Sequence, residues 1–355
     1  MNLPATASET GNLDLRETTM QLVRGENLSR SEAANFLDAL LDPTATDTQI
    51  SAALIALTTK GETVEELAGM AEAMRQRAIP LHSRHERFID TAGTGSSAVK
   101  RFNISTAAAF VIAGAGLPVA KHGARAASST SGSADVLEAL GVNTAASPEV
   151  VERCLNDHGI CFIFAPFFHR ATARVAQVRR ELGVHTTFNL LGPLTNPARA
   201  PFQLVGVWDQ SLVERVASAL ALLGVKQAWV VHGADGLDEV TITNETFVAA
   251  CSARTGAKTL TISPEDFGLQ RRSINRRREG PIENAQVIRA ILDGEKNGDF
   301  AVARDLVVIN AAAALYLAGI ANDFQNAAAL ARESIASGHA ASKLDVLIRE
   351  TNRSE

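Results

Sequence analysis

The segment IDTAGTGSSAVKRFNISTAAAFVIAGAG, residues 89–116, decides the fold class of this chain. A short apolar run ends at Asp90, the glycines Gly93 and Gly95 follow, and an alanine-rich stretch with helical spacing begins at Ser105. This order predicts a strand, a glycine turn and the start of a helix. Glycine lets the backbone approach a ligand closely, and the free amides of a helix N-terminus attract phosphate. The segment therefore indicates a strand-to-helix unit that either binds phosphate or is an ordinary turn.

The same alternation continues along the chain on both sides of this segment. Strands are expected at residues 87–90, 117–121, 160–165, 202–208, 227–232 and 258–262. Helices are expected between most of them, at residues 105–115, 132–141, 148–158 and 212–224. Such alternation predicts an α/β fold with a mostly parallel central sheet flanked by helices, against which the helical last third, residues 285–352, packs. Ligands of such sheets bind where strands end and helices begin.

Residues 13–85 have a purely helical pattern. Ser29 with Glu32 and Thr63 with Glu66 have the spacing of capping boxes, and each pair precedes a run of apolar residues at helical spacing. The pattern predicts a small all-helical domain of about four helices, before a larger α/β domain over residues 86–355. The amphipathic, arginine-rich helix expected at residues 172–183 would bring about residues 167–186 back to the small domain. Residues 1–12 are polar and are expected to be a flexible N-terminus.

Composition excludes several classes of protein. The 34 basic and 39 acidic residues give a formal charge of −5, which is not typical of a protein that binds nucleic acid or a membrane surface. The most apolar stretch, residues 106–119, is too short to span a bilayer. The first residues lack the basic start and apolar core of a signal peptide, so a cytoplasmic protein is expected. Cys154, Cys161 and Cys251 are widely spaced and are expected to be buried free thiols.

A second polar segment follows the strand expected to end at Lys121. Lys121, His122 and Arg125 lead into a helix start that is rich in hydroxyl groups, supplied by Ser128, Ser129, Thr130, Ser131 and Ser133. Cations and hydroxyl donors at the end of a strand suit a diphosphate. The alternative is a polar surface loop, in which His122 is a hydrogen-bonded loop histidine.

A third segment, GADGLDEV at residues 233–240, follows the apolar strand that ends at His232. Its adjacent carboxylates, Asp238 and Glu239, suit Mg²⁺, which takes oxygen ligands and bridges to substrate phosphates. Adjacent carboxylates in a turn can also be simply solvated. A diphosphate site needs amides, cations and a metal together, and the three segments jointly offer them.

Several motifs resemble those of the anthranilate phosphoribosyltransferases in order and spacing, from about residue 13 to the C-terminus. They are GTG at 93–95, NIST at 103–106, KHG at 121–123, SGSADVLEALG at 131–141, FNLLGPLTNP at 188–197, LDE at 237–239, PEDFG at 264–268, ENA at 283–285 and NAA at 310–312. The resemblance implies a small helical domain and a larger α/β domain with the active site in the cleft between them. It also implies homodimers formed through the helical part.

The resemblance further implies the substrates and the residues that bind them. The donor, 5-phosphoribosyl 1-diphosphate (PRPP), would contact the first motifs, at Gly93, Thr94, Gly95, Ser96, Asn103, Ser105, Thr106, Lys121 and Ser133. Two Mg²⁺ ions would bind to Ser105, Asp238 and Glu239. The acceptor, anthranilate, would contact His122, Ala124, Arg179 and the turn of Gly192 and Pro193.

The implied reaction joins the anthranilate nitrogen to C1 of the ribose as diphosphate leaves. The residues implied in catalysis are Lys121, which would stabilise the leaving group with Mg²⁺, His122, and Arg179, which would pair with the anthranilate carboxylate. Because an arylamine is a weak base, positioning and leaving-group electrostatics should supply most of the rate. Without the resemblance, Arg179 in the run Arg179-Arg180-Glu181 is typical of a solvated helix face.

The chain departs from the family pattern at three places. Ser96 and Ser97 stand where the family usually has glycine and aspartate, Ala124 replaces an asparagine, and Val184-His185 replaces an isoleucine-arginine pair. The last two changes lie near the expected acceptor site. A related aromatic amine therefore remains an alternative acceptor.

Two other functions remain open from the sequence. A pyrimidine nucleoside phosphorylase would share the fold, but it uses free phosphate and does not need the pair Asp238 and Glu239. A non-catalytic nucleic-acid-binding relative would need a basic surface, for which the chain offers the cluster Arg271, Arg272, Arg276, Arg277 and Arg278. That cluster is either a solvated face or a binding patch.

Overall fold

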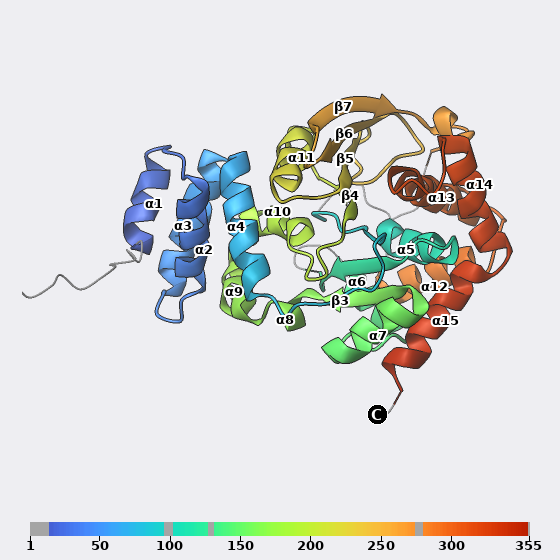
Figure 1. Ribbon diagram of the computed structural model, residues 1–355, viewed down its shortest axis with the longest axis horizontal. Helices are drawn as coiled ribbons and strands as arrows, with labels where there is room; N and C mark the ends of the chain where they lie inside the picture. Colours follow the sequence, from blue (N-terminus) through green and yellow to red (C-terminus); the bar gives the residue numbers. More distant parts are fainter. Residues whose placement is uncertain (1–13, 96–101, 127–130, 274–279, 354–355) are drawn as a thin grey trace, which may run out of the picture.

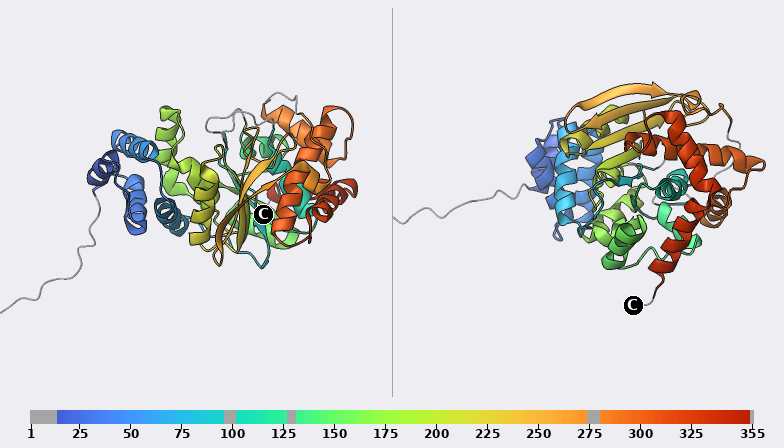
Figure 2. Two further views of the ribbon diagram at one scale, coloured as in Figure 1. Left: turned by 90° about the horizontal axis from the view of Figure 1, so that it is seen from above. Right: turned by 45° about the vertical axis from the view of Figure 1, so that its right-hand side comes forward.

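The computed structural model describes residues 14–95, 102–126, 131–273 and 280–353. The N-terminal segment expected to be flexible lies outside these residues. Four helices begin the described chain: α1 (Leu15–Val23), α2 (Arg30–Leu41), α3 (Asp47–Lys60) and α4 (Val64–Arg77). They form the blue group at one end of the molecule in Figures 1 and 2.

The capping boxes expected at the starts of α2 and α4 are present. In each, the hydroxyl of Ser29 or Thr63 accepts a hydrogen bond from the backbone three residues later, and Glu32 or Glu66 accepts one from the cap backbone. These bonds satisfy amides that a helix start otherwise leaves unpaired. The helices pack through fully buried side chains such as Phe36, Leu54 and Leu67.

A seven-stranded mixed sheet forms the larger part of the molecule. Its order is β3-β2-β1-β4-β5-β6-β7, in which the first five strands are parallel and the last two run antiparallel to their neighbours. The strands are β1 (Ile89–Asp90), β2 (Val119–Gly123), β3 (Ile160–Phe164), β4 (Phe202–Gly206), β5 (Gln227–Gly233), β6 (Thr246–Ser252) and β7 (Gly256–Ile262). The predicted fold class, a small helical part with a mostly parallel sheet flanked by helices, is confirmed.

Successive residues of the sheet point to opposite faces, and each face contributes to a separate hydrophobic core. On β5, Trp229 and Val231 join a core with α5 (Ile104–Gly114), whereas Ala228 and Val230 join a second core with the N-terminal helices. The helices that cover the first core are α6 (Ser133–Ala139), α7 (Pro148–His158), α12 (Pro281–Leu292), α13 (Asp299–Leu317), α14 (Phe324–Ala336) and α15 (His339–Thr351). The C-terminal helices thus lie at the opposite end of the molecule from α1–α4 (Figure 2).

Three further helices connect the sheet to the N-terminal group. They are α9 (Ala173–Leu182), α10 (Thr187–Leu194) and α11 (Leu212–Leu222), and the short α8 (Ala165–Phe168) precedes them. Val175 and Val178 of α9 are buried in the second core, and α9 contacts α2 and α3. We expected Gly192 and Pro193 to form a turn. They lie instead in the last turn of helix α10. This helix starts because Thr186 and Asn189 form a capping box.

Arg75 at the end of α4 joins the two parts. Its Nε donates to the carbonyl of Leu194 at 2.7 Å and its guanidinium to the carbonyl of Leu223 at 3.4 Å. Leu194 is the last residue of α10, and Leu223 directly follows the last residue of α11. Carbonyls at the C-terminus of a helix lack a partner within the helix and attract cations. Burial, with the nearby charge of Arg199, lowers the pKa of Arg75 to about 10.

One helix in the described part of the chain, α13, is long and apolar enough over Phe300–Leu317 to cross a membrane. However, 67% of that stretch is buried inside the protein, where α13 packs against α5 and α14. It is therefore a core helix. The three cysteines are free and buried, as predicted.

Candidate active site

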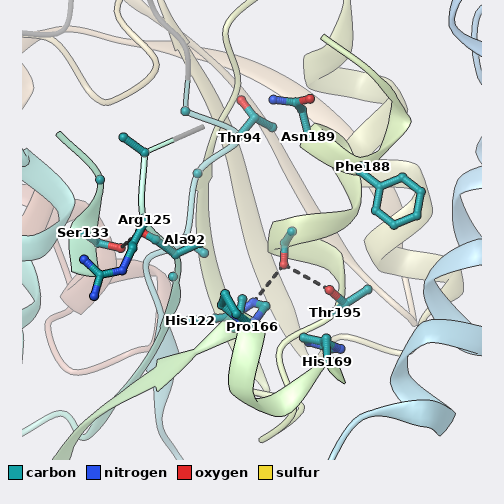
Figure 3. Close-up of a pocket in the computed structure, with 18 of the residues that line it drawn as sticks. Ala92, Thr94, His122, Arg125, Ser133, Pro166, His169, Phe188, Asn189 and Thr195 are labelled. Carbon is teal, nitrogen blue, oxygen red and sulfur yellow. Dashed lines mark hydrogen bonds between the residues drawn. The ribbon is translucent and has the colours of Figure 1, made fainter. Parts of the chain in front are cut away.

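A pocket of about 340 Å³ opens where the glycine turn after β1, the end of β2, and helices α9 and α10 meet. Figure 3 shows the residues around it. The predicted site residues that line it are Gly93, Thr94, Gly95, Asn103, Ser105, Thr106, Lys121, His122, Ala124, Ser133 and Arg179. The structure thus brings together residues that are up to 86 positions apart in the sequence, from Gly93 to Arg179.

The N-terminus of α5 forms one wall of the pocket. Asn103 is the N-cap residue but its side chain makes no capping bond. Its Oδ1 instead accepts from the Ser131 hydroxyl at 3.3 Å and from Asn284 Nδ2 of α12 at 3.2 Å. Among the residues that the structure describes, no side chain therefore caps the first amides of α5, which leaves this helix end suited to an anion.

The hydroxyl of Thr106 lies in the same first turn of α5. Thr106 is only 1% exposed, and its Oγ1 has no hydrogen-bond partner among the described residues. A buried hydroxyl without a partner is unfavourable by about 1–3 kcal/mol. Because Thr106 lines the pocket, an oxygen of a bound phosphate would satisfy it.

Lys121 supplies a buried cation beside this wall. Its Nζ donates to the carbonyl of Thr91 at 3.2 Å and to the Ser105 hydroxyl at 3.4 Å. Asp90 lies behind it, where burial raises the pKa of the carboxyl to about 6, and Lys121 partly offsets that rise. Asp90 accepts from the backbone of His122 at 3.1 Å and from Asn196 Nδ2 at 2.7 Å, which ties β1 to β2 at the pocket floor.

Two histidines face each other deeper in the pocket, with His122 on β2 and His169 after α8. Their ring centroids are 5.2 Å apart. Nδ1 of His122 donates to the carbonyl of Gly192 at 3.0 Å, which also accepts from the Thr195 hydroxyl (Figure 3). Burial lowers the pKa of His122 to about 3 and that of His169 to about 4. Both rings are therefore neutral near pH 7, and each Nε2 is a buried acceptor with no partner in the described chain.

Arg179 on α9 also lines the pocket. Nε donates to the Thr186 hydroxyl at 3.0 Å and Nη2 to Asn189 Oδ1 at 2.9 Å. The guanidinium is also 5.5 Å from the ring centroid of Phe188. Burial lowers the pKa of Arg179 to about 10, so the side chain stays charged at neutral pH. The solvated-face reading is wrong for Arg179, whereas Arg180 is exposed.

Asp238 and Glu239 are buried but do not line the pocket. They follow β5 and lie directly beside Gly206. No side chain fits on Gly206, because an added Cβ would lie 1.7 Å from the Asp238 carbonyl oxygen. On its other side, the Gly206 carbonyl accepts from the Thr94 backbone at 2.8 Å and from its hydroxyl at 3.2 Å. One glycine of β4 thus holds the acidic turn close to the glycine turn of the pocket.

The donor set fits Mg²⁺ bound together with a diphosphate. Within the described ranges, no three His, Cys, Asp or Glu side chains gather closely enough to hold a metal by themselves. Two carboxylates and the Ser105 hydroxyl leave several positions of an octahedral ion for water and phosphate oxygens, which is the usual protein site of Mg²⁺.

The other candidate residues either do not line the pocket or lie outside the described residues. Pro193 is buried and does not line it, whereas its neighbour Gly192 does. Ser96 lies outside the described residues, as do Arg276, Arg277 and Arg278. Arg271 pairs with Glu265 at 3.1 Å and Arg272 with Asp305 at 3.4 Å, as expected of a solvated face.

Sequence reasoning missed His169, Phe188 and Asn189, which also line the pocket. His169 is a single histidine next to arginine in the sequence, and nothing in its spacing indicates a site. Phe188 and Asn189 stand in a motif that the family resemblance used, but their type and spacing suggest only an ordinary helix start.

Comparison with known proteins identifies the family. Residues 85–341 match the α/β domain of a glycosyl transferase family, and residues 16–78 match the helical bundle domain of that family. Anthranilate phosphoribosyltransferase of Moorella thermoacetica is 50% identical over 335 residues, covering 94% of this chain and 97% of its own length.

Solved structures agree with this match. The crystal structure of anthranilate phosphoribosyltransferase from Thermus thermophilus is 41% identical with a TM-score of 0.86, covering 94% of this chain and 99% of its own. The Saccharomyces cerevisiae enzyme in complex with PRPP and Mg is 29% identical with a TM-score of 0.86, covering 97% and 98%. The yeast enzyme has also been solved with 4-fluoroanthranilate. This chain belongs to the anthranilate phosphoribosyltransferases, glycosyltransferases of tryptophan biosynthesis.

Proposed function

We propose that this phosphoribosyltransferase binds PRPP against the N-terminus of α5 and anthranilate between His122 and Arg179, in the one pocket described above. The observation that carries the proposal is the arrangement of charge and donors across that pocket. Lys121 and the unpartnered hydroxyl of Thr106 lie at one wall, and the guanidinium of Arg179 lies at the other. A diphosphate and an aromatic carboxylate are the anions that these two walls suit.

The donor contacts follow from the geometry of the first wall. The backbone of Gly93, Thr94 and Gly95 and the first turn of α5 approach the phosphates, while Lys121 neutralises charge on the leaving diphosphate. Asn103, Ser105, Thr106 and Ser133 supply further donors, and Ser96, which follows Gly95 in the sequence, is a further candidate. Ser105, Asp238 and Glu239 would hold two Mg²⁺ ions, which would supply stabilisation of the negative charge that builds on the leaving group.

The acceptor is oriented by groups that are neutral or cationic at pH 7. Arg179 pairs with the carboxylate, Ala124 and Gly192 border the ring, with the buried Pro193 next to Gly192 in the chain, and Phe188 packs near Arg179. The Nδ1 proton of His122 is held by Gly192, so Nε2 accepts a hydrogen bond from the amine. With a pKa of about 3, His122 is too weak a base to remove a proton early, so its role is orientation.

The reaction then needs one displacement. The amine nitrogen forms a bond to C1 of the ribose while the bond from C1 to the diphosphate oxygen breaks, and the amine loses one proton to solvent. Both reactants are held in a pocket between two rigid walls. Positioning and leaving-group electrostatics therefore supply most of the rate, and Lys121, His122 and Arg179 are the residues that provide them.

We also propose the division of the chain and its assembly. Residues 13–85 with about 167–186 form the small domain, and the rest of 86–355 forms the α/β domain, a division supported by the valines of α9 in the second core. Exposed Met20, Val23 and Ile55 on α1 and α3 support a homodimer through this end. Three free buried thiols support a cytoplasmic location, where thiols stay reduced.

The test is loss of anthranilate fluorescence when the purified protein is mixed with PRPP and Mg²⁺, with and without a chelator. Chelator-sensitive loss is expected. If the fluorescence is stable although PRPP raises the melting temperature, the donor site stands and the acceptor is a different aromatic amine.

A further inference from the structure

The side chain of Asn189 makes two hydrogen bonds through one atom. Its Oδ1 accepts from the Thr186 backbone at 3.0 Å, which closes the capping box of α10, and from Arg179 Nη2 at 2.9 Å. Both partners are N–H donors, so only the amide oxygen can occupy this position. The amide nitrogen is thereby fixed on the opposite side.

That nitrogen faces the pocket. Asn189 is half-buried and lines the cavity, and Figure 3 shows its amide nitrogen pointing towards Thr94 across the pocket. Nδ2 has no hydrogen-bond partner among the residues that the structure describes, so both of its protons are available to a ligand. Nδ2 shares its carbon with the oxygen that Arg179 contacts. The amide nitrogen and the guanidinium are therefore adjacent donors.

We propose that Asn189 is a further acceptor-binding residue, whose Nδ2 donates to the carboxylate of anthranilate beside Arg179. The inference rests on the proposed acceptor site. Arg179 uses Nε for Thr186 and one Nη2 proton for Asn189, so its other three N–H groups make no hydrogen bond within the described residues. A planar carboxylate has two oxygens, and it can take one donor from Arg179 and one from Asn189.

The helix itself does not require an amide at this position. An aspartate at 189 would accept from Thr186 and Arg179 equally well, and a negative charge in the first turn of α10 would interact favourably with the helix dipole. What asparagine offers here and aspartate lacks is the pair of N–H donors facing the pocket, without a negative charge. Those donors suit a ligand anion.

The variant Asn189→Asp separates the two roles, because it retains both accepted bonds and replaces the inward donor with a charge. We expect the melting temperature to stay the same or rise. The dissociation constant of anthranilate should rise by at least about tenfold, because a hydrogen bond to a charged group is replaced by repulsion, while the KM for PRPP stays within about twofold. Gln325→Glu is the matched control, because it makes the same amide-to-carboxylate change at an exposed position in the first turn of a helix, α14, outside the pocket.

A second ligand makes the result independent of any loss of folding. The carboxamide of 2-aminobenzamide can donate to the new carboxylate, so Asn189→Asp should shift the preference between anthranilate and 2-aminobenzamide by at least about tenfold towards the amide. A merely structural defect would weaken both ligands equally. An unchanged preference, or an increase in the KM for PRPP alone, would overturn the assignment. If the unaltered protein does not use anthranilate at all, the proposed function fails instead, and this outcome is seen before any variant is made.

Discussion

Thr106 places a buried hydroxyl without a partner in the first turn of α5. Thr106→Val keeps the shape of the side chain and removes only the hydroxyl. The melting temperature should stay the same or rise, because a buried group without a partner is lost, whereas the KM for PRPP should rise about tenfold as a hydrogen bond to phosphate disappears. Thermal denaturation and donor-dependent kinetics measure the two effects. A lower melting temperature with an unchanged KM would contradict the proposed phosphate contact.

The buried histidines give the protein a defined dependence on pH. His169 has a folded pKa of about 4, below its ordinary value of 6.5, so the unfolded chain takes up a proton first as the pH falls. The free energy of unfolding should therefore decrease between about pH 6.5 and 4. His122 acts in the same direction, while Asp90, with its pKa raised to about 6, opposes both.

The variant His169→Asn removes one of these groups. The decrease in unfolding free energy should become shallower by up to about 1.4 kcal/mol per pH unit, which is the largest slope that one proton can contribute. Urea denaturation at half-unit steps of pH measures it. A slope identical to that of the unaltered protein would mean that His169 titrates normally in the folded state.

The sequence predicts individual residues best where their chemistry is unusual for their position. Lys121 at the end of an apolar strand and the pair Asp238 and Glu239 after another are conspicuous. Asn189 is not, because its significance lies in which way its amide faces, and that depends on Arg179, ten residues away and on another helix. The sequence cannot predict which atom of an amide is left free.

The end of β4 controls how close the acidic turn lies to the pocket. Gly206→Ala would place a methyl group 1.7 Å from the Asp238 carbonyl oxygen, so the turn carrying Asp238 and Glu239 must move. A displacement of about 1 Å at a reacting site can lower the rate about a hundredfold. We therefore expect kcat of the variant to fall about a hundredfold and to recover partly at high Mg²⁺ concentration. Turnover measured over a range of Mg²⁺ tests this.

Val205→Ala in the same strand is the control for Gly206→Ala. It opens a cavity in the second core and should lower the melting temperature without changing the dependence on Mg²⁺. If both variants respond to Mg²⁺ alike, the acidic turn does not depend on Gly206.

Elements are predictable where a local pattern is complete. The strand expected at residues 202–208 forms as β4, and the helix expected at 148–158 forms as α7 between its Ser147 cap and Gly159. Strand β6 was missed because Ala249, Ala250 and Cys251 have little strand preference. Pairing with β5 and β7 on either side makes this segment a strand. Such pairing is not encoded locally.

At the scale of the whole molecule, the pocket lies between two hydrophobic cores. The pocket wall formed by α5 and β2 belongs to the first core, whereas α9 and α10, which carry Arg179 and Asn189, pack in the second core with the N-terminal helices. The existence of two parts could be predicted from the change in sequence pattern. The return of α9 was expected from its amphipathic pattern, whereas that of α10 depends on contacts between residues more than a hundred positions apart, such as Glu62 with Thr187.

The exposed apolar residues of α1 and α3 make a prediction about assembly. Val23→Glu with Met20→Glu should convert a homodimer into a monomer in analytical ultracentrifugation, because two charges would be buried at the interface. Activity per chain should change little, because the pocket is at a distance. Ile282→Glu alters a comparably exposed apolar residue on α12, away from the N-terminal helices, and should leave the dimer intact. A monomeric unaltered protein would reject the proposed interface.

The two bonds of Arg75 have a mechanical consequence. They fasten the end of α4 to the ends of α10 and α11, so a rocking motion of the N-terminal helices must carry α10 with it. Arg179 and Asn189 would then move together relative to Lys121. The distance between the proposed acceptor site and the proposed ribose site would change with that motion. The width of the pocket would thereby depend on Arg75, a residue that does not line it.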